Sequence, residues 1–554
     1  MNLSKSRSMF RVRSAATAVV LLGVLAAASG CGSSTKATSP GSSAAAKPSS
    51  GLIQFGLQQE PGTLSPLTGP FTTAQQIVGA TLFTNLFVLK SDGSLAPSLA
   101  SEVPTTQNGG ISQNGLVYTF HLKSGLKWSD GQPITSQDVY ETYKLSMSKQ
   151  INALTTNGFS DIQTFDIISP TEFKITLQKP DPALLTTVFD TCTPGIIPWH
   201  VYKNISAADI NKSPLNNKPT VTDGPYVLKS WNPGQSITVA PNPHWYGPKV
   251  QNKGITFNIV ADDATLLAES QAHKVNVYWF VPIGQVPQLK KISGEHVALL
   301  SAPNFEYVDI NFRNPILQDV RVRKALELAI DRQALVQKVW DGYAKLTASD
   351  QPPLSWGSNP SLKPYPYDPT QAAKLLQQAG WIKGTNGYRY KNGKELTITF
   401  STTTGNPWRQ QTEQLVQYWY KQIGVNLVIK NYPSNVYFGT VLPSGQNWML
   451  GEFGNVNQPD PGTISADSFA KGGVFNFGGY DNSQVDQLFA EQATMTSKSA
   501  RQQKLWQIEQ ILHDQVAGLF LYSPDQIVAW YGVSGYQPNT WYEDTWDAYN
   551  WKLQ

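Results

Sequence analysis

Residues 114–144 read NGLVYTFHLKSGLKWSDGQPITSQDVYETYK. Residues 117–122 alternate and are rich in β-branched and aromatic side chains, so they predict a strand. Two short turns that contain glycine follow, and such turns tolerate unusual backbone angles. Thr135 or Ser136 is a suitable N-cap for a helix, with Asp138 in its first turn. The stretch therefore predicts a strand, a turn and a helix in succession.

The same stretch carries a family resemblance. YTFHL at 118–122 and GLKWSDG at 125–131, followed by Thr135 and Asp138, form a long ordered string. It resembles the signature of the family 5 extracytoplasmic solute-binding proteins, the oligopeptide, dipeptide and nickel binders that serve ATP-driven importers. Further segments resemble the same family at 58–66, 91–100, 222–247, 319–332, 367–381 and 480–488.

This resemblance implies an α/β fold of the periplasmic-binding-protein type II kind, in which two large lobes close about a hinge. It also implies an extra small α+β lobe. The first large lobe would comprise residues 51–89, 216–305 and 517–554, the small lobe 90–215, and the second large lobe 306–516.

Two features of the second large lobe are predicted from the residues. A strand at 396–400, a helix at 410–423 and a strand at 425–429 indicate a βαβ unit with parallel strands. A strand at 305–311 would cross into this lobe, and residues 519–522 would return to the first one.

The beginning of the chain resembles an export signal. Four basic residues lie within the first 13 positions, and a mostly apolar run follows at 15–28. The run is too short to span a bilayer comfortably but suits a signal peptide over 1–30. Ala-Ser-Gly-Cys at 28–31 resembles a lipobox, which would make Cys31 the lipidated first residue. An ordinary signal peptide with an incidental cysteine is the alternative. Residues 31–50 would be a flexible tether.

Composition narrows the class of protein. The formal charge is +4, and removal of the four basic signal residues brings it close to zero. No block of basic residues indicates nucleic-acid binding. Only Cys192 remains besides Cys31, so the mature chain has no intrachain disulfide. The 16 Trp, 23 Tyr and 22 Phe suit either a ligand cleft or a large core.

Residues 449–469 are the most informative stretch for the ligand. The resemblance implies an aspartate four residues before a proline, which in peptide-binding relatives pairs with the α-ammonium group of the peptide. Here that position is Asn455, and an amide cannot balance an ammonium charge in a dry cleft. Glu452 or Asp460 could substitute. Alternatively, Asn455 and Asn457 suit a neutral ligand that is rich in hydroxyl or amide groups.

Other candidates come from the 58–66 loop, which lies by the cleft in relatives, and from tryptophans that could stack on a sugar. The candidate ligand-binding residues are Gln59, Glu60, Thr63, Leu64, Trp408, Trp448, Glu452, Phe453, Asn455, Asn457 and Asp460. For each of them, loop packing or turn capping is the alternative interpretation.

The sequence shows no hydrolase, zinc or nucleotide-binding motif, and its six histidines are scattered. We therefore expect no enzyme activity, metal or cofactor. We expect a monomeric, extracytoplasmic lipoprotein that is anchored to the outer face of the cell membrane. It would deliver a solute, chiefly a peptide, to the permease subunits of an ABC transporter. An oligosaccharide, another uncharged solute or an N-blocked peptide is the alternative ligand. A secreted glycosidase and a lipoprotein for sensing or extracellular folding are alternatives of other classes.

Overall fold

The structure is a computed structural model, and it describes residues 51–69, 72–156, 158–189, 195–541 and 544–554. The predicted signal peptide, Cys31, the whole predicted tether and Cys192 lie outside the described residues. No helix in the described ranges combines the length and the apolar character needed to cross a membrane.

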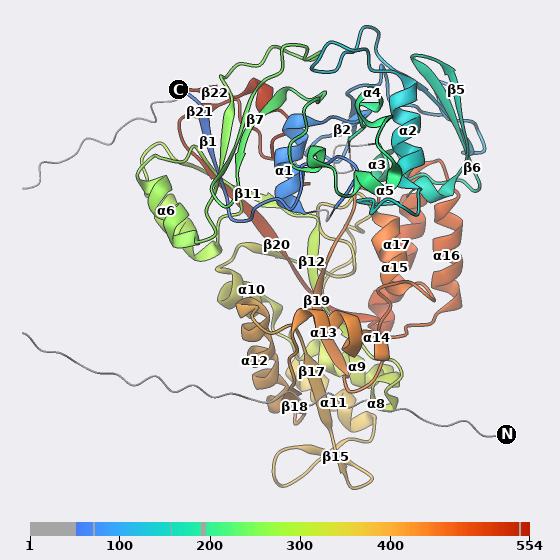
Figure 1. Cartoon of the computed structure of the whole chain (residues 1–554). Coiled ribbons are helices and arrows are strands. Elements are labelled where there is room, and N and C mark those ends of the chain that lie inside the picture. Colours follow the sequence, from blue (N-terminus) through green and yellow to red (C-terminus); the bar gives the residue numbers. More distant parts are fainter. Residues whose placement is uncertain (1–50, 70–71, 157, 190–194, 542–543) are drawn as a thin grey trace, which may run out of the picture. The chain divides into compact units, whose positions relative to one another are not determined.

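One large mixed sheet runs through both large lobes (Figure 1). Its strand order is β18 (Asn426–Ile429), β17 (Thr397–Ser401), β19 (Leu450–Val456), β12 (Asn304–Ile310), β20 (Gly518–Trp530), β10 (Val277–Tyr278), β1 (Ile53–Leu57), β9 (Ile255–Ile259), β8 (Ser236–Pro241) and β7 (Tyr226–Asn232). Two further strands, β11 (His296–Ser301) and β13 (Ala344–Leu346), also pair with β20.

The first large lobe is organised around β1, which is parallel to both β9 and β10. Ile53, Phe55 and Leu57 are fully buried because helix α1 (Thr73–Leu82) and the C-terminal segment pack against the sheet. Phe55 packs on Phe257 with ring centroids 5.3 Å apart. The lobe also contains α6 (Asp263–Gln271), α7 (Val286–Leu289), the short helices η3 (Ile283–Gln285) and η5 (Ala548–Asn550), β21 (Val533–Ser534) and β22 (Lys552–Leu553).

The small lobe is built on the strand and helix of residues 114–144. β4 (Val117–His121) pairs with β6 (Glu172–Leu177), which pairs with β5 (Ile162–Ser169). Phe120 stacks on Phe173 with centroids 4.8 Å apart, and Phe173 stacks on Phe165 at 4.9 Å. The remaining elements are β2 (Phe87–Leu89), β3 (Leu95–Pro97), α2 (Ser136–Ser146), η1 (Phe159–Asp161), α3 (Leu184–Thr187), α4 (Trp199–Tyr202), α5 (Ala207–Ile210) and η2 (Pro214–Asn216). The predicted strand and helix are confirmed.

In the second large lobe, β17 and β18 are parallel and joined by α12 (Pro407–Gln422), which confirms the predicted βαβ unit. The other helices are α8 (Pro315–Gln318), α9 (Val320–Leu328), α10 (Arg332–Trp340), α11 (Pro369–Gln378), α13 (Ser434–Val436), the π-helix η4 (Tyr437–Val441), α14 (Leu442–Ser444), α15 (Pro461–Phe469), α16 (Ser483–Ala493) and α17 (Lys498–Gln515). A small separate sheet holds β14 (Ile382–Lys383), β15 (Arg389–Lys391) and β16 (Lys394–Glu395).

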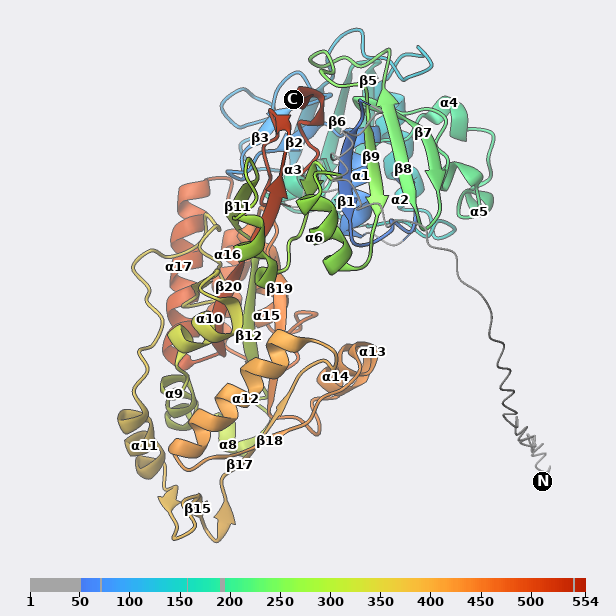
Figure 2. The ribbon, with the colours of Figure 1, turned by 90° about the vertical axis from the view of Figure 1, so that its left-hand side faces the viewer.

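The chain passes between the large lobes next to β20 (Figure 2). One crossing joins the end of β11 at Ser301 to the start of β12 at Asn304. The other lies inside β20, because residues 518–522 pair with β12 whereas residues 525–530 pair with β11. Residues 519–522 therefore still pair within the second lobe, and the return comes later than the sequence suggested. The lobe boundaries themselves remain a prediction.

Helix α2 depends on a capping box at its start. Asp138 accepts hydrogen bonds from the backbone N–H of Thr135 at 2.8 Å and of Trp199 at 3.0 Å. We expect Asp138→Ala to lower the free energy of unfolding of the small lobe by about 2 kcal/mol, since two buried donors lose their acceptor. Urea unfolding checks this, with Gln137→Ala, at an exposed position of the same helix, as the control. Equal losses in the two variants would contradict the prediction.

Candidate functional site

The candidate residues come from three places in the fold. Gln59, Glu60, Thr63 and Leu64 follow β1 in the first lobe, and Trp408 lies in the first turn of α12. The remaining candidates lie on β19 and on the segments just before and after it.

The loop after β1 is held to its surroundings by polar side chains. Glu60 Oε1 accepts from Trp231 Nε1 at 2.8 Å and from the backbone N–H of Gly234 at 3.0 Å. Thr63 Oγ1 donates to the carbonyl of Asn216 at 2.9 Å, and Leu64 is buried. Gln59 is exposed. Glu60 and Thr63 therefore fix the loop, and only Gln59 points outward.

Phe280, which sequence reasoning missed, lies beside this loop. Its carbonyl accepts from Gln58 Nε2 at 2.9 Å, and its side chain is 52% exposed. Its φ is +58°, a left-handed conformation that is costly for a bulky residue. Strained and exposed aromatic residues are more typical of ligand sites than of cores. No pattern in the sequence signals a positive φ at phenylalanine.

Strand β19 has two distinct faces, because successive side chains point to opposite sides of a strand. Phe453 and Asn455 point toward the core that contains α15, α16 and α17. Glu452 and Gly454 share the other face with Glu306 of β12. The candidates on β19 are thus divided between two environments.

The first face is well packed. Asn455 Nδ2 donates to Ser468 Oγ at 2.9 Å, and Asn455 is only 7% exposed. Phe453 is buried and meets Tyr307 edge-on, with ring centroids 4.9 Å apart. Asn457 Nδ2 donates to Gln351 Oε1 at 3.2 Å. The amide groups of both asparagines are thus engaged inside the second lobe.

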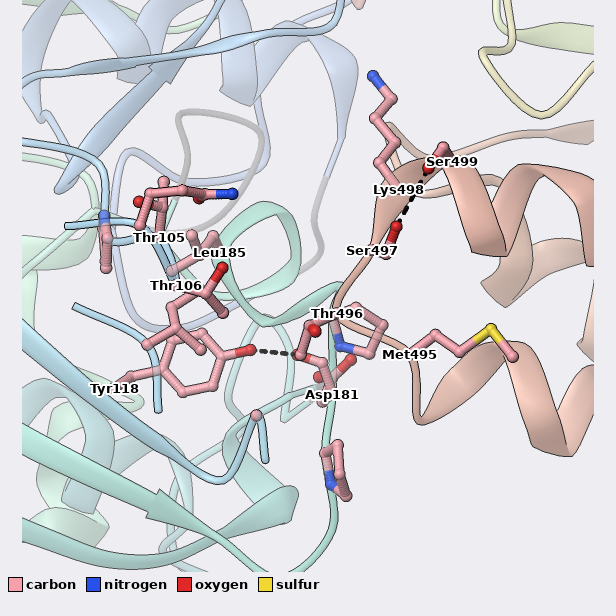
Figure 3. Close-up of a pocket in the computed structure, with 16 residues that line it drawn as sticks. Thr105, Thr106, Tyr118, Asp181, Leu185, Met495, Thr496, Ser497, Lys498 and Ser499 are labelled. Carbon is pink, nitrogen blue, oxygen red and sulfur yellow. Dashed lines mark hydrogen bonds between the residues drawn. The ribbon is translucent and has the colours of Figure 1, made fainter. Parts of the chain in front are cut away.

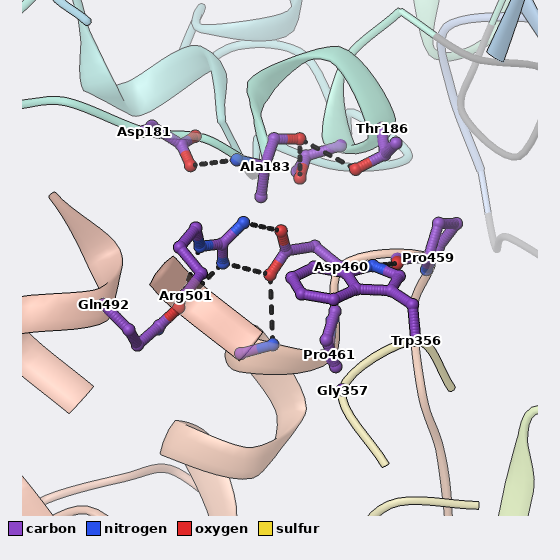
Figure 4. A network of polar contacts seen from close by, with 12 residues as sticks. Asp181, Ala183, Thr186, Trp356, Gly357, Pro459, Asp460, Pro461, Gln492 and Arg501 are labelled. Atoms are coloured by element: carbon purple, nitrogen blue, oxygen red, sulfur yellow. Dashed lines mark hydrogen bonds and ion pairs between the residues drawn. The ribbon is translucent and has the colours of Figure 1, made fainter. Parts of the chain in front are cut away.

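Asp460 forms a buried ion pair with Arg501 of α17 (Figure 4). Arg501 Nη1 and Nη2 donate to its two carboxylate oxygens at 2.5 and 2.8 Å. Asp460 Oδ1 also caps α15 by accepting from the backbone N–H of Gly462 at 3.0 Å. Gln492 Oε1 accepts from the same guanidinium group. Asp460 therefore already has its cation, which argues against the predicted role as an acceptor for a ligand ammonium group.

The two candidate tryptophans differ in exposure. Trp408 is 39% exposed and packs against Trp340 with ring centroids 5.8 Å apart. Trp448 is only 2% exposed and belongs to the core under α15 to α17. Trp408 can offer a face to a ligand, whereas Trp448 would first have to leave the core.

On the second face of β19, Glu306 and Arg409 form a pair in which Arg409 Nη2 donates to Glu306 Oε1 at 2.9 Å. Glu452 lies next to this pair and is fully buried. Burial, followed by the nearby charge of Glu306, raises the pKa of the Glu452 carboxyl well above its usual value. Burial at this position therefore favours the protonated form of Glu452.

Two cavities lie along the seam between the small lobe and the second large lobe. One of about 500 Å³ lies between residues 104–118 and 180–185 on one side and residues 495–499 on the other (Figure 3). Tyr118 donates from its hydroxyl to the carbonyl of Asp181 at 2.9 Å in its wall. The other, of about 430 Å³, is bordered by Asp181, Asp460 and Arg501. The Asp460–Arg501 pair thus lies where the two lobes face each other.

The chain matches the bacterial extracellular solute-binding proteins, family 5 Middle, over residues 94–473. It therefore belongs to the family 5 bacterial extracellular solute-binding proteins, which confirms the resemblance seen in the sequence. Oligopeptide-binding protein AppA of Bacillus subtilis (strain 168) is 26% identical over 532 residues, 93% of this chain and 94% of AppA. Glutathione-binding protein GsiB of Escherichia coli O1:K1 / APEC is 27% identical over 449 residues, 79% of this chain and 82% of GsiB.

Solved structures confirm the two-lobed type II fold. AppA from Bacillus subtilis in complex with a nonapeptide superposes with a TM-score of 0.71 at 23% identity, over 91% of this chain and 98% of that chain. HbpA2 from Haemophilus parasuis superposes with a TM-score of 0.79 at 21% identity, over 91% of this chain and 99% of that chain.

The Asp460–Arg501 pair makes a testable contribution to stability. We expect Arg501→Met to lower the free energy of unfolding by about 3–5 kcal/mol, because it leaves a buried carboxylate without its cation. Lys504→Met on the same helix is the control, since its pair with Glu491 is partly exposed and should contribute less than about 1 kcal/mol. Chemical unfolding followed by circular dichroism measures both, and similar losses would contradict the assignment.

Proposed function

We propose that this chain captures a peptide between its two large lobes and delivers it to the permease subunits of an ABC transporter. The observation that carries the proposal is the match to oligopeptide-binding protein AppA along nearly the whole of both chains. Family membership gives the general role of extracellular solute binding. The peptide and the importer are inferred from the named relatives.

Closure would take place at the two crossings. They lie side by side, since Ser523 Oγ donates to the carbonyl of Ala302 at 3.3 Å. Pro524 lies opposite Ala344 of β13 and has no N–H to give, so the pairing of β20 with β13 lacks a backbone donor at this residue. Small rotations at such positions can bring two rigid lobes together over a ligand. We place the hinge at residues 302–304 and 523–525.

The polar groups near the predicted amine position favour a peptide whose amino group is not the main anchor. Asn455 is uncharged, and Asp460 is paired with Arg501. Neither can neutralise a free α-ammonium group as a free aspartate would. An N-blocked peptide, or one held mainly through its backbone, is consistent with this arrangement.

An oligosaccharide is the second candidate ligand. The observation in its favour is the exposed face of Trp408, because a flat aromatic face is suited to stacking on a sugar ring. Turnover of such a sugar would instead indicate a secreted glycosidase, the alternative of another class. We favour binding without catalysis, since the named relatives are binding proteins.

The site of action follows from the family and from the first residues. We propose that Cys31 is lipidated and that residues 32–50 tether a monomeric body to the outer face of the cell membrane. Two acyl chains on one cysteine suffice for stable anchoring. Labelling with a radioactive fatty acid, lost in Cys31→Ser, tests this proposal.

Native mass spectrometry of residues 32–554, purified without denaturation, tests the proposed ligand class. We expect a mass excess that fragments into amino acids, since closed binding proteins retain ligand. A mass excess with hexose spacing would refute the peptide proposal in favour of a sugar. If the protein carries no ligand, a thermal-shift screen with peptides and oligosaccharides tests the ligand class instead. A shift with oligosaccharides and none with peptides would also refute the peptide proposal.

Asn455 provides a second test. We expect Asn455→Asp to raise the preference for peptides with a free amine over their N-acetylated forms by about tenfold, since a charge-assisted hydrogen bond is added. Isothermal titration calorimetry measures this ratio, and Asn457→Asp serves as the control at a neighbouring amide. An unchanged ratio in Asn455→Asp would show that this position does not face the amino end of the ligand.

A further inference from the structure

A charged cluster lies on the face of β19 opposite Asn455. Arg409 at the start of α12 holds Glu306 through two hydrogen bonds, Nε to Oε2 at 3.1 Å and Nη2 to Oε1 at 2.9 Å. Its Nη1 donates to Thr403 Oγ1 at 3.3 Å. A side chain at Gly454 would collide with the Glu306 carboxylate, so glycine is needed here to leave room for the pair.

Glu452 lies two residues earlier on the same face. It is fully buried, and neither of its carboxyl oxygens accepts a hydrogen bond of normal geometry from the described residues. A buried polar group without a partner is costly, so native proteins rarely keep one without a reason. The carboxyl group therefore has two unused acceptor positions in a confined space.

The groups that face Glu452 come from four elements. They are Glu306 of β12, Arg409, Thr412 and Glu413 of α12, Tyr437 of η4 and Tyr522 of β20. The Thr412 hydroxyl lies 3.0 Å from the carbonyl of Trp408, to which it donates. Arg409 is committed to Glu306, so no free cation is available to Glu452 among these groups.

The cluster reaches the surface at one end. The side chains of Glu306 and Arg409 are 10% and 13% exposed, and nearby Trp408 and Val456 are 39% and 51% exposed. Glu306 also pairs with Tyr522 of β20, close to the crossing between the lobes. The exposed apolar side chains of Trp408 and Val456 thus lie near the ion pair, and Glu452 is buried beside that pair.

We propose that Glu306, Arg409 and Glu452 form a recognition site for a positively charged side chain of the ligand, an ammonium or guanidinium group. The proposal rests on the proposed peptide-binding function and adds a specificity to it. Without ligand, Glu306 and Arg409 neutralise each other. When a cation enters, Glu452 ionises, its oxygens gain donors, and one proton is released to solvent.

The charge balance also explains what the site would reject. A neutral side chain offers fewer donors to the two oxygens and leaves Glu452 protonated. A carboxylate side chain would face Glu306 and Glu452 and would have to compete for Arg409 with Glu306. Peptides with a cationic side chain at this site should thus bind more tightly than those with a neutral side chain, and those with an acidic side chain should bind most weakly.

Competition between peptides tests the ranking. Residues 32–554 are incubated with N-acetylated, C-amidated hexapeptides of random small neutral residues that carry either one lysine or one glutamine, and bound peptides are read by native mass spectrometry. We expect about tenfold enrichment of lysine peptides on the wild type, from one extra charge-assisted contact. Glu452→Gln should reduce the enrichment to about twofold or less.

Asp309→Asn is the matched control. Asp309 lies on β12 but on the opposite face, and burial raises the pKa of its carboxyl to about 8. Both variants replace a buried carboxyl whose pKa is raised by burial with an amide of the same size, and both should fold. Equal binding of lysine and glutamine peptides, or enrichment of lysine peptides that survives Glu452→Gln, would overturn the proposed cation site but leave the proposed peptide-binding function intact. Binding of no peptide at all would overturn the proposed function as well.

Proton release gives an independent readout. Calorimetry of an enriched lysine peptide in buffers of different ionisation enthalpy should show about one proton released by the wild type and by Asp309→Asn, and none by Glu452→Gln. Because ionisation of Glu452 accompanies binding, affinity should rise with pH up to the pKa of Glu452 in the free protein. Binding by the wild type without proton release would overturn the inference.

Discussion

The arrangement of the large lobes depends on β20, a single strand of 13 residues that is hydrogen-bonded in both of them. Its first part pairs with β12 and β13, and its last part pairs with β11 and β10. Each half of the sheet thus provides backbone partners for the same strand, and neither half is complete without it. The positions of β12 and β19, and of every candidate residue on them, follow from this shared strand.

Three buried carboxylates of the second large lobe are paired with an arginine. Glu306 has Arg409, Glu327 has Arg332 and Asp460 has Arg501, and these six side chains are nearly excluded from water. Guanidinium groups suit this role because they remain charged and can bind both oxygens of a carboxylate. Among the described residues, both carboxyl oxygens of Glu452 lack a hydrogen bond, and the excess of carboxyl groups at that place favours a cationic ligand group.

The sequence predicted local structure well where strong short-range signals coincide. The strand at 117–122 and the helix after Thr135 were recognisable because alternation, glycine turns and a capping box agree. The parallel βαβ unit around α12 was equally clear from its periodicity. The site was harder to predict, because a list of polar residues on β19 does not show which of them are already paired. Arg501, which engages Asp460, lies 41 residues away along the chain.

The sequence by itself determined the α/β class, because strand, turn and capping residues can be read locally. The family and the solute-binding role came from the resemblance of an ordered string of residues to the family 5 signature. Tertiary structure alone decided which candidates are free to meet a ligand. It buried Trp448, paired Asp460 and exposed Phe280 in a strained conformation, and within the described residues it left both carboxyl oxygens of Glu452 without a hydrogen bond. The physical reason is that burial and ion pairing depend on contacts between segments far apart in the chain, which no local pattern encodes.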